Sequence, residues 1–314
     1  RSGVQWLCCS ESRAPITALR AEKPKGAAEP APYFVERSAN GPVNPHRDFI
    51  IGMLAAGGVN KNQKFLPPDG GAVTLAQFVK IALYTLPPME YFKKPRLETG
   101  TDGNELGWTL LAMAHMADLR DPWITLRGEK LTAADVLGAA ISHDIPRGSC
   151  AGTHELIGIA ALHAAHEADR VADGGELKGE WYFAREYLDR AIDAARENQT
   201  ESGAFGPQWY KNKKEPKNPI DAIYYTGHVL DWLVTALPEE ELSEKWVRKS
   251  VSFLAGEMNL YMDQLMDYPE YAFHAAHALK TYLHRTTPPR RNFEKWQSKS
   301  SLKRPCPFLF CQGS

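Results

Sequence analysis

The stretch from residue 178 to residue 237 constrains the fold most, because it joins a charged helix to a nearly uncharged one. In the first helix, apolar residues recur at steps of three and four, and charged side chains cover the remaining circumference. The second helix, residues 220–237, carries only two charged residues, Asp221 and Asp231. Since so apolar a helix must be covered on several sides, the sequence predicts an amphipathic outer helix packed on an apolar inner one.

The same alternation recurs along the chain and predicts four helical hairpins. Amphipathic helices are expected at residues 74–86, 132–142, 178–199 and 239–258, and apolar helices at residues 104–119, 152–169, 220–237 and 268–284. A shorter apolar helix is expected at residues 46–56. Asn104 and Thr132 are the expected N-caps of two of these helices, and Pro269 suits a first helical position.

A signal for β-strands is missing, since no stretch alternates cleanly between apolar and polar residues over four or more positions. The sequence therefore predicts an all-α protein with at least eight helices between His46 and Arg285, and no sheet beyond isolated bridges. Helical-hairpin repeats of this kind form either an open superhelical stack or a ring with the apolar helices inside.

One repeat motif carries a resemblance. The pattern Gln199-x-x-x-Gly203-x-Phe205 follows a charged helix and precedes an apolar one. It resembles the Gln-x-x-x-Gly-x-aromatic repeat of the squalene–hopene cyclase and protein prenyltransferase superfamily. The resemblance implies an α/α toroid, or a partial toroid, over roughly residues 46–285. The basic-Gly and aromatic-aliphatic positions that precede the Gln in that family are not in place here.

The catalytic motifs of that superfamily do not occur in the chain. Squalene cyclases protonate their substrate with an Asp-x-Asp-Asp cluster, and protein prenyltransferases hold zinc with an Asp, a Cys two positions later and a distant His. Neither Asp-x-Asp-Asp nor Asp-x-Cys is present. The resemblance therefore implies the fold, and we expect neither terpene cyclase nor protein prenyltransferase activity.

The sequence predicts that the chain is divided into three segments. Residues 1–45, rich in Pro and Ala, are expected to form an extended arm or linker. Residues 46–287 are expected to form the toroid domain. Residues 288–314 are basic and unpatterned, and are expected to form a poorly ordered tail.

Composition and charge exclude some partners. The 314 residues carry a net charge of −1 and no basic stripe with interleaved aromatics, so we expect no nucleic-acid partner. No run approaches the roughly 20 apolar residues that a membrane span needs, which predicts a soluble protein without a span. The sequence begins at Arg1 and not at Met, so the compartment is undetermined and export stays open.

The candidate site residues are polar side chains on the apolar helices. On residues 220–237, Tyr224 and Asp231 lie on the same stripe as His228. His228 is the candidate general acid or base, Asp231 the carboxylate that would orient it, and Tyr224 a second proton carrier. The candidate ligand-binding residues lie on neighbouring helices, on the same helix and in the preceding loop: His154, Trp232, His274, His277 and Trp209.

Three interpretations of these residues stay open. They are buried polar groups that pair with one another, or they line a ligand-binding or catalytic lumen, or they hold a metal. Cys150 and His154 are four residues apart, but no set has an established ligand spacing, so no metal and no cofactor is predicted. The five cysteines are interpreted as incidental thiols, with terminal disulfides as the alternative.

The functional hypotheses follow from the expected ring. The first is a ligand- or partner-binding repeat domain, with a small molecule, glycan or protein bound in the toroid mouth. The alternative is a carbohydrate- or lipid-active enzyme with a histidine-centred site there, so whether the protein is an enzyme stays open. The loops at residues 87–103, 143–151, 200–219 and 259–267 are expected to gather around that mouth.

Overall fold

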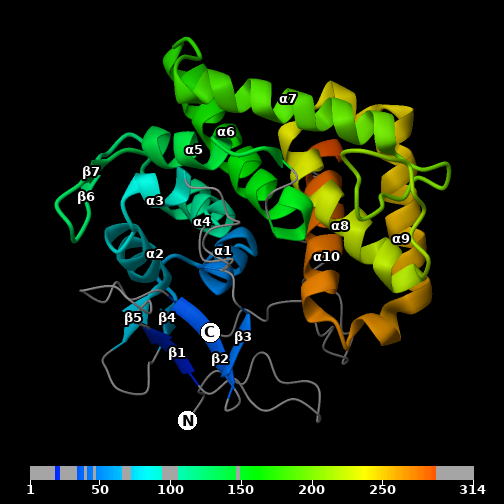
Figure 1. Cartoon of the computed structure of the whole chain (residues 1–314), viewed down its shortest axis with the longest axis horizontal. Helices are drawn as coiled ribbons and strands as arrows, with labels where there is room; N and C mark the ends of the chain where they lie inside the picture. Colours follow the sequence, from blue (N-terminus) through cyan, green and yellow to red (C-terminus); the bar gives the residue numbers. More distant parts are fainter. Residues whose placement is uncertain are drawn as a thin grey trace, which may run out of the picture.

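Apolar and amphipathic helices alternate along the chain, and the structure sorts them into an inner and an outer set (Figure 1). The computed structural model describes residues 18–21, 34–38, 41–44, 47–65, 72–93, 105–145 and 149–287. Within these ranges it contains ten α-helices. In chain order they are α1 (Phe49–Ala56), α2 (Leu75–Tyr84), α3 (Met89–Lys93), α4 (Gly107–Met116), α5 (Ala133–Ile141), α6 (Thr153–Asp173), α7 (Glu180–Asn198), α8 (Pro219–Ala236), α9 (Lys245–Leu265) and α10 (Pro269–Thr286).

The inner set consists of α4, α6, α8 and α10, which pack side by side in that order. α1 covers α4 on one side, and α5, α7 and α9 lie outside the inner helices, with α7 along the top and α9 at the right of Figure 1. The row also bends back on itself, because Trp108 of α4 lies 5.7 Å from His274 of α10, measured between ring centroids. The four inner helices therefore surround a common centre.

Glycines set how closely the inner helices approach. A Cβ atom added to Gly158 of α6 would lie 2.1 Å from the carbonyl oxygen of Gly107, and one added to Gly107 would lie 2.1 Å from that of His154. The α4 and α6 backbones are thus in direct contact. On the other side of the centre, a Cβ atom on Gly227 of α8 would lie 3.0 Å from the backbone nitrogen of Ala275 on α10. Only glycine permits the first of these crossings without displacing a helix.

The predicted layers are confirmed. His154, Leu156, Leu230, Leu233 and Ala275 are buried, and Leu279 is half-buried. On the outer helices, the charged residues Asp189, Arg196, Lys245 and Arg248 are exposed, and Arg185 is half-buried. The reason is the one inferred from the sequence, since the outer helices carry charge on one face and the inner helices carry almost none.

The helix ends follow local chemistry. The predicted Thr132 cap is confirmed, as a capping box in which Thr132 and Asp135 bond each other's backbone N–H groups. Pro269 occupies the first turn of α10 as expected. The predicted Asn104 cap is wrong, because α4 begins at Gly107 after Leu106, which makes no side-chain cap. Asn104 itself lies outside the described residues.

Two predictions about secondary structure are wrong. Strands pair into small antiparallel sheets: β1 (Ala18–Ala21), β2 (Phe34–Ser38) and β3 (Gly41–Asn44) in one, β4 (Lys64–Phe65) with β5 (Val73–Thr74), and β6 (Trp123–Ile124) with β7 (Lys130–Leu131). β1 to β3 fall within the segment expected to be an extended arm, where Asn40-Gly41 is a frequent hairpin dipeptide. A short 3-10 turn, Glu240–Ser243, comes first, and α9 then starts at Lys245. Because α9 continues to Leu265, most of the expected loop 259–267 is helical.

The repeat motif joins the α7–α8 loop to α9. The Gln199 side-chain amide donates to the carbonyl oxygen of Trp246, 2.8 Å away, and to the hydroxyl of Ser250, 2.6 Å away. The Ser250 hydroxyl donates in turn to the carbonyl oxygen of Gly203, which has a φ of 99°. Phe205 is fully buried, and its N–H donates to the Thr226 hydroxyl. The motif thus positions a loop between two hairpins.

Two further expectations concern the whole chain. Across the described residues, no helix combines the length and apolar character needed to cross a bilayer. The predicted basic tail, residues 288–314, lies outside the part of the chain that the structure describes.

We predict that Gly158→Ala destabilises the protein by about 2–3 kcal/mol, because the added methyl group overlaps the α4 backbone. The matched control is Gly256→Ala on α9, where an added Cβ meets nothing within 4 Å. That substitution should be neutral or should stabilise by up to about 1 kcal/mol through helix propensity. Urea unfolding of both variants checks this, and equal effects would contradict the close crossing of α4 and α6.

Candidate functional site

Aromatic rings from four inner helices meet at the centre of the molecule. The ring centroids of His154 (α6) and His228 (α8) are 5.4 Å apart, and those of His228 and His274 (α10) are 3.8 Å apart. Trp108 (α4) closes the group at 4.9 Å from His154. The structure thus brings the three histidines together, and each of them is at most 4% exposed. The rings fill the space between the helices, and we call this group, together with Cys150, the histidine–thiol cluster.

Each of the three imidazoles has its Nδ1 atom next to an oxygen acceptor. The His154 Nδ1 atom lies 2.7 Å from the Glu105 carboxylate, and the His274 Nδ1 atom 2.8 Å from Oδ2 of Asp231. The His228 Nδ1 atom lies 2.8 Å from the carbonyl oxygen of Tyr224. Because a carbonyl or an ionised carboxylate only accepts, Nδ1 carries the proton in the hydrogen bonds of His228 and His274. In the neutral imidazole this leaves Nε2 with its lone pair for another partner.

Cys150 approaches the cluster from an unusual turn just before α6. Cys150 and Ala151 both have left-handed backbone angles, with φ of 50° and 58°. The following Gly152 has φ 82°, and a Cβ atom there would lie 1.8 Å from the carbonyl oxygen of Ile145. Non-glycine residues adopt this conformation at a cost, and such strain is most frequent at functional sites.

Hydrogen bonds hold this turn in place. The Thr153 hydroxyl donates to the carbonyl oxygen of Cys150 at 2.8 Å, and the indole N–H of Trp209 donates to that of Ala151 at 3.2 Å. The Tyr224 hydroxyl donates to the sulfur of Cys150 at 3.0 Å. The thiol is therefore fixed in position from both the α7–α8 loop and α8.

Three side chains in the cluster could ligate one metal ion. One ligand atom each from Cys150, His154 and His228 can be chosen so that all three lie within 4.8 Å of one another. His154 and His228 are 4% and 3% exposed, and Cys150 is half-buried. Thiolate sulfur and imidazole nitrogen are the donors that zinc prefers.

The electrostatics of the cluster favour a charged His154. Burial lowers the pKa of His154, but the Glu105 carboxylate and the Cys150 thiol outweigh burial and hold that pKa well above the usual imidazole range. Burial dominates at His274, whose pKa is lowered although Asp231 accepts its hydrogen bond. Burial and the nearby Cys150 both raise the pKa of Tyr224, so its hydroxyl stays protonated and remains a donor.

The predicted pairing of His228 with Asp231 is wrong. Asp231 directs its carboxylate toward α10, where its oxygens lie 2.8 Å from His274 Nδ1 and 2.5 Å from His277 Nδ1. A spacing of three residues places His228 and Asp231 on neighbouring parts of the α8 surface, but α10 supplies the nearer partners. Asp231 thus joins α8 to α10, and His228 takes its orientation from the backbone of Tyr224.

The remaining predicted ligand-binding residues have packing roles. Trp209 and Trp232 are 1% and 0% exposed, and their ring centroids are 5.5 Å apart. His277, 14% exposed, bonds Asp231 at the edge of the cluster. Glu105 was not predicted as a member of the site, and Cys150 was considered only as a possible metal ligand with His154. The four-residue spacing of Cys150 and His154 was visible, whereas the contact of Glu105 with α6 depends on the tertiary fold.

The loops expected around a mouth are partly brought together. His143 bonds the carbonyl oxygen of Phe92, which joins the loop after α5 to α3. The Trp209 bond to Ala151 joins the α7–α8 loop to the turn before α6. The rings of Tyr224 and Tyr271 are 4.2 Å apart, which brings the starts of α8 and α10 together. Cys150 lies among these described loop segments.

Comparisons with known proteins add no family assignment. No protein-family model, no curated protein and no solved structure matches the chain.

We predict that Asp231 stabilises the fold in a pH-dependent way. Burial raises the Asp231 pKa, but the charge and hydrogen bonds of His277 and His274 outweigh burial and lower that pKa to about 2, from 3.8. A lowered carboxyl pKa stabilises the folded state above pH 3.8, and the contribution is lost as the pH falls toward 2. The difference in unfolding free energy between the native protein and Asp231→Asn should therefore shrink by roughly 2 kcal/mol between pH 5 and pH 2.

Urea unfolding at several pH values measures this difference. Asp193→Asn on the exposed face of α7 is the matched control, and its difference from the native protein should stay constant over the same range. A constant difference for Asp231→Asn as well would show that the two histidines do not stabilise the carboxylate.

Proposed function

We propose that the protein is a metalloprotein that binds a soft divalent ion, zinc being the best fit, through Cys150, His154 and His228. The observation that carries the proposal is the convergence of one donor atom from each residue within 4.8 Å. The Nδ1 atom of His228 faces the carbonyl oxygen of Tyr224, and that of His154 lies 2.7 Å from the Glu105 carboxylate, so ligation would use Nε2 of each ring. Because the pKa of His154 is raised, zinc would displace a proton from that ring on binding. Histidines that ligate metals usually donate their other ring N–H to a carboxylate or carbonyl oxygen, as His228 does to the carbonyl oxygen of Tyr224.

Three protein ligands would leave one position of a tetrahedral ion for an outside ligand. Structural zinc sites use four protein ligands, whereas catalytic zinc sites use three and keep the fourth for water or substrate. When bound, zinc supplies Lewis acidity and lowers the pKa of a water at the open position. The chain would supply the orientation of the ligands, through Glu105, the Tyr224 carbonyl group and the Tyr224 hydroxyl.

The packing at the centre supports a metal over a sugar or lipid in the same place. Trp108, His154, His228 and His274 fill the space between the four inner helices, so the lumen expected for a carbohydrate- or lipid-active enzyme is occupied by side chains. An outside ligand would instead reach the centre beside Cys150, the one half-buried residue of the three. The proposal therefore keeps the ligand-binding role inferred from the sequence, with the ligand bound beside the Cys150 thiol.

We also propose that the inner and outer helices form a partial α/α toroid. The alternation of apolar and amphipathic helices supports it, as does the contact of α10 with α4 through His274 and Trp108. The proposed activity differs from that of the superfamily that the motif resembles, because neither of its catalytic motifs occurs in the chain.

A second candidate function uses Cys150 as a nucleophile without metal. The left-handed backbone of Cys150, its place before the N-terminus of α6, and the Glu105–His154 pair favour it. In that case His154 would take the thiol proton and Glu105 would orient the imidazole. The two functions use the same sulfur, so metal content separates them.

We predict that the purified protein binds one zinc ion and that Cys150→Ser and His228→Gln each lower zinc affinity at least about a hundredfold, since each removes a ligand. Glu105→Gln should lower affinity by about 10- to 100-fold, because it weakens the orientation of His154. Competition with a chromogenic chelator measures these affinities, and elemental analysis measures the stoichiometry. His284→Gln on the exposed end of α10 is the matched control and should change neither.

Alkylation with iodoacetamide, followed by peptide mass spectrometry at Cys150, distinguishes the two candidates. If zinc is bound there, chelation should speed alkylation at Cys150 and added zinc should slow it. Absence of zinc binding, together with fast alkylation that Glu105→Gln slows, would reject the metal centre and favour the nucleophile. Melting of His228→Gln with chelator present should stay close to that of the native protein, and a large loss would indicate a packing role for His228.

A further inference from the structure

A shallow surface hollow lies along α9 and shares no lining residue with the histidine–thiol cluster. It has a volume of about 450 Å³ and is lined by one residue of the α7–α8 loop and five of α9: Ser202, Lys245, Arg248, Lys249, Ser252 and Phe253. A second hollow of about 250 Å³ shares Ser202 and Phe253 with it. The two hollows therefore adjoin each other at Ser202 and Phe253, and we call them together the α9 groove.

The repeat motif builds one wall of this groove. A Cβ atom added to Gly203 would lie 2.8 Å from the carbonyl oxygen of Lys249, so the loop rests directly on α9. Gln199 and Ser250 bond the two elements together beneath that contact. Ser202 is held from the other side, since its N–H and hydroxyl donate to the Glu215 carboxylate at 3.2 and 3.1 Å. The wall of the groove is thus fixed before any ligand binds.

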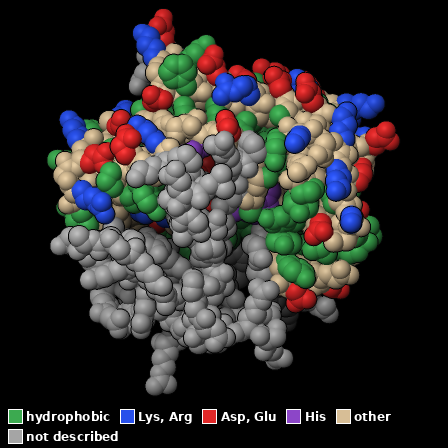
Figure 2. Space-filling view, viewed as in Figure 1, with side chains coloured by type: hydrophobic (Ala, Val, Ile, Leu, Met, Phe, Trp, Pro, Cys, Tyr) green, Lys and Arg blue, Asp and Glu red, His purple; other side chains and the backbone are tan. Residues whose placement is uncertain are grey.

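The charge of the first hollow is concentrated and positive. Lys245, Arg248 and Lys249 occupy positions i, i+3 and i+4 of α9, so their side chains share one face. Among the described residues, no acidic side chain forms an ion pair with any of the three. Like charges at this spacing repel one another. Figure 2 shows Lys and Arg side chains on the side of the molecule where Figure 1 places α9 and the α7–α8 loop.

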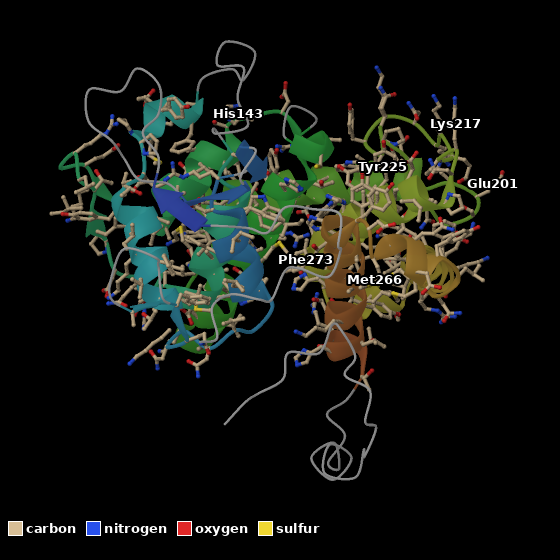
Figure 3. All side chains as sticks on the ribbon, turned by 90° about the horizontal axis from the view of Figure 1, so that it is seen from below. His143, Glu201, Lys217, Tyr225, Met266 and Phe273 are labelled. Carbon is tan, nitrogen blue, oxygen red and sulfur yellow. The ribbon has the colours of Figure 1, made fainter. Side chains whose placement is uncertain are left out.

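The second hollow has a different chemistry. Its lining mixes acidic, basic and amide side chains with prolines, among them Glu215, Lys217, Asn218 and Glu257. Figure 3 shows Lys217 and Glu201 at the outer edge of the α7–α8 loop. Phe253, half-buried, lies where the two hollows join. A ligand that fills both would need an anionic end, an apolar ring face near its middle and hydroxyl groups.

We propose that the α9 groove binds a sugar that carries a phosphate or sulfate ester. The ester group would lie among Lys245, Arg248 and Lys249, where it would relieve their mutual repulsion and accept charge-assisted hydrogen bonds. The sugar ring would stack on Phe253, and its hydroxyl groups would reach the carboxylate and amide side chains of the second hollow. The groove shares none of its lining residues with the proposed metal centre, so the two proposals are independent.

Isothermal titration calorimetry with four probes tests the proposal: glucose 6-phosphate, glucose 6-sulfate, inorganic phosphate and glucose. We expect the two esters to bind, inorganic phosphate to bind more weakly, and glucose to show no binding. Comparison of the two esters identifies which oxyanion is preferred. Binding should weaken as salt is raised from 20 mM to 300 mM sodium chloride, because exposed charges are screened.

Variants locate the site on the groove. Arg248→Gln and Lys249→Gln should each lower ester affinity by about tenfold or more, since each removes a charged hydrogen-bond donor. Phe253→Ala should weaken the esters and leave inorganic phosphate unchanged. Lys80→Gln on the exposed face of α2 is the matched control, and melting curves confirm that each variant is folded.

Three outcomes would overturn the proposal. These are a lack of binding by both esters at millimolar concentration, equal loss of affinity in Lys80→Gln and Arg248→Gln, and binding of glucose as tight as that of its esters. The first would leave α9 with a solvated basic face, the second would show a general charge effect, and the third would indicate a site for neutral sugars. A failure of zinc binding at Cys150 would change none of these results.

Discussion

The contact of Gly107 with Gly158 is the constraint on which the centre of the molecule depends. It brings the α4 and α6 backbones together, and so places Glu105 and Trp108 at the start of one helix beside His154 at the start of the other. With any side chain at Gly158, the two helices would separate and the Glu105–His154 pair would lengthen. Gly227 does the same for α8 and α10, and brings His228 against His274. Two glycine crossings therefore gather three imidazoles from distant parts of the chain.

Hydrogen bonds then decide what these imidazoles can do. A carboxylate lies next to Nδ1 of His154 and of His274, and a backbone carbonyl oxygen next to Nδ1 of His228. The Tyr224 hydroxyl donates to the sulfur of Cys150. Asp231 accepts from two histidines of α10 and so acts as a buried link between helices. Buried imidazoles need such neighbours in any role, because buried polar groups are nearly always paired. In the proposed metal centre, the same neighbours would also orient the rings of His154 and His228 toward the ion.

The sequence predicted the layers of the fold better than it predicted which side chains contact each other in the site. Charge on residues 178–199 and its near absence on residues 220–237 were enough to separate outer from inner helices, since burial of charge is costly. The spacing of His228 and Asp231 predicted a pair, but helical spacing describes one helix and cannot include the neighbour that comes closer. The role of Glu105 was missed for the same reason, and Cys150 was paired only with His154 of its own helix start, because the other partners depend on how α4, α6 and α8 cross. Strands β4 to β7 were missed because two residues per strand give no period to detect, and β1 to β3 because four or five residues give only a weak one.

The way the centre is assembled has a consequence for how the protein folds. The residues of the centre come from four successive hairpins: Glu105 from the first, Cys150 from the second, His228 and Asp231 from the third, and His274 from the fourth. The contacts between these hairpins therefore join distant parts of the sequence. Contacts of this kind form late, after the local helices, because closing long loops costs chain entropy. A chain that ended before α10 would lack His274 and His277, and the Asp231 carboxylate would be left without its two imidazole partners. Such a chain would also expose the face of α8 that α10 covers in the complete protein, and exposed apolar surface of this kind promotes aggregation.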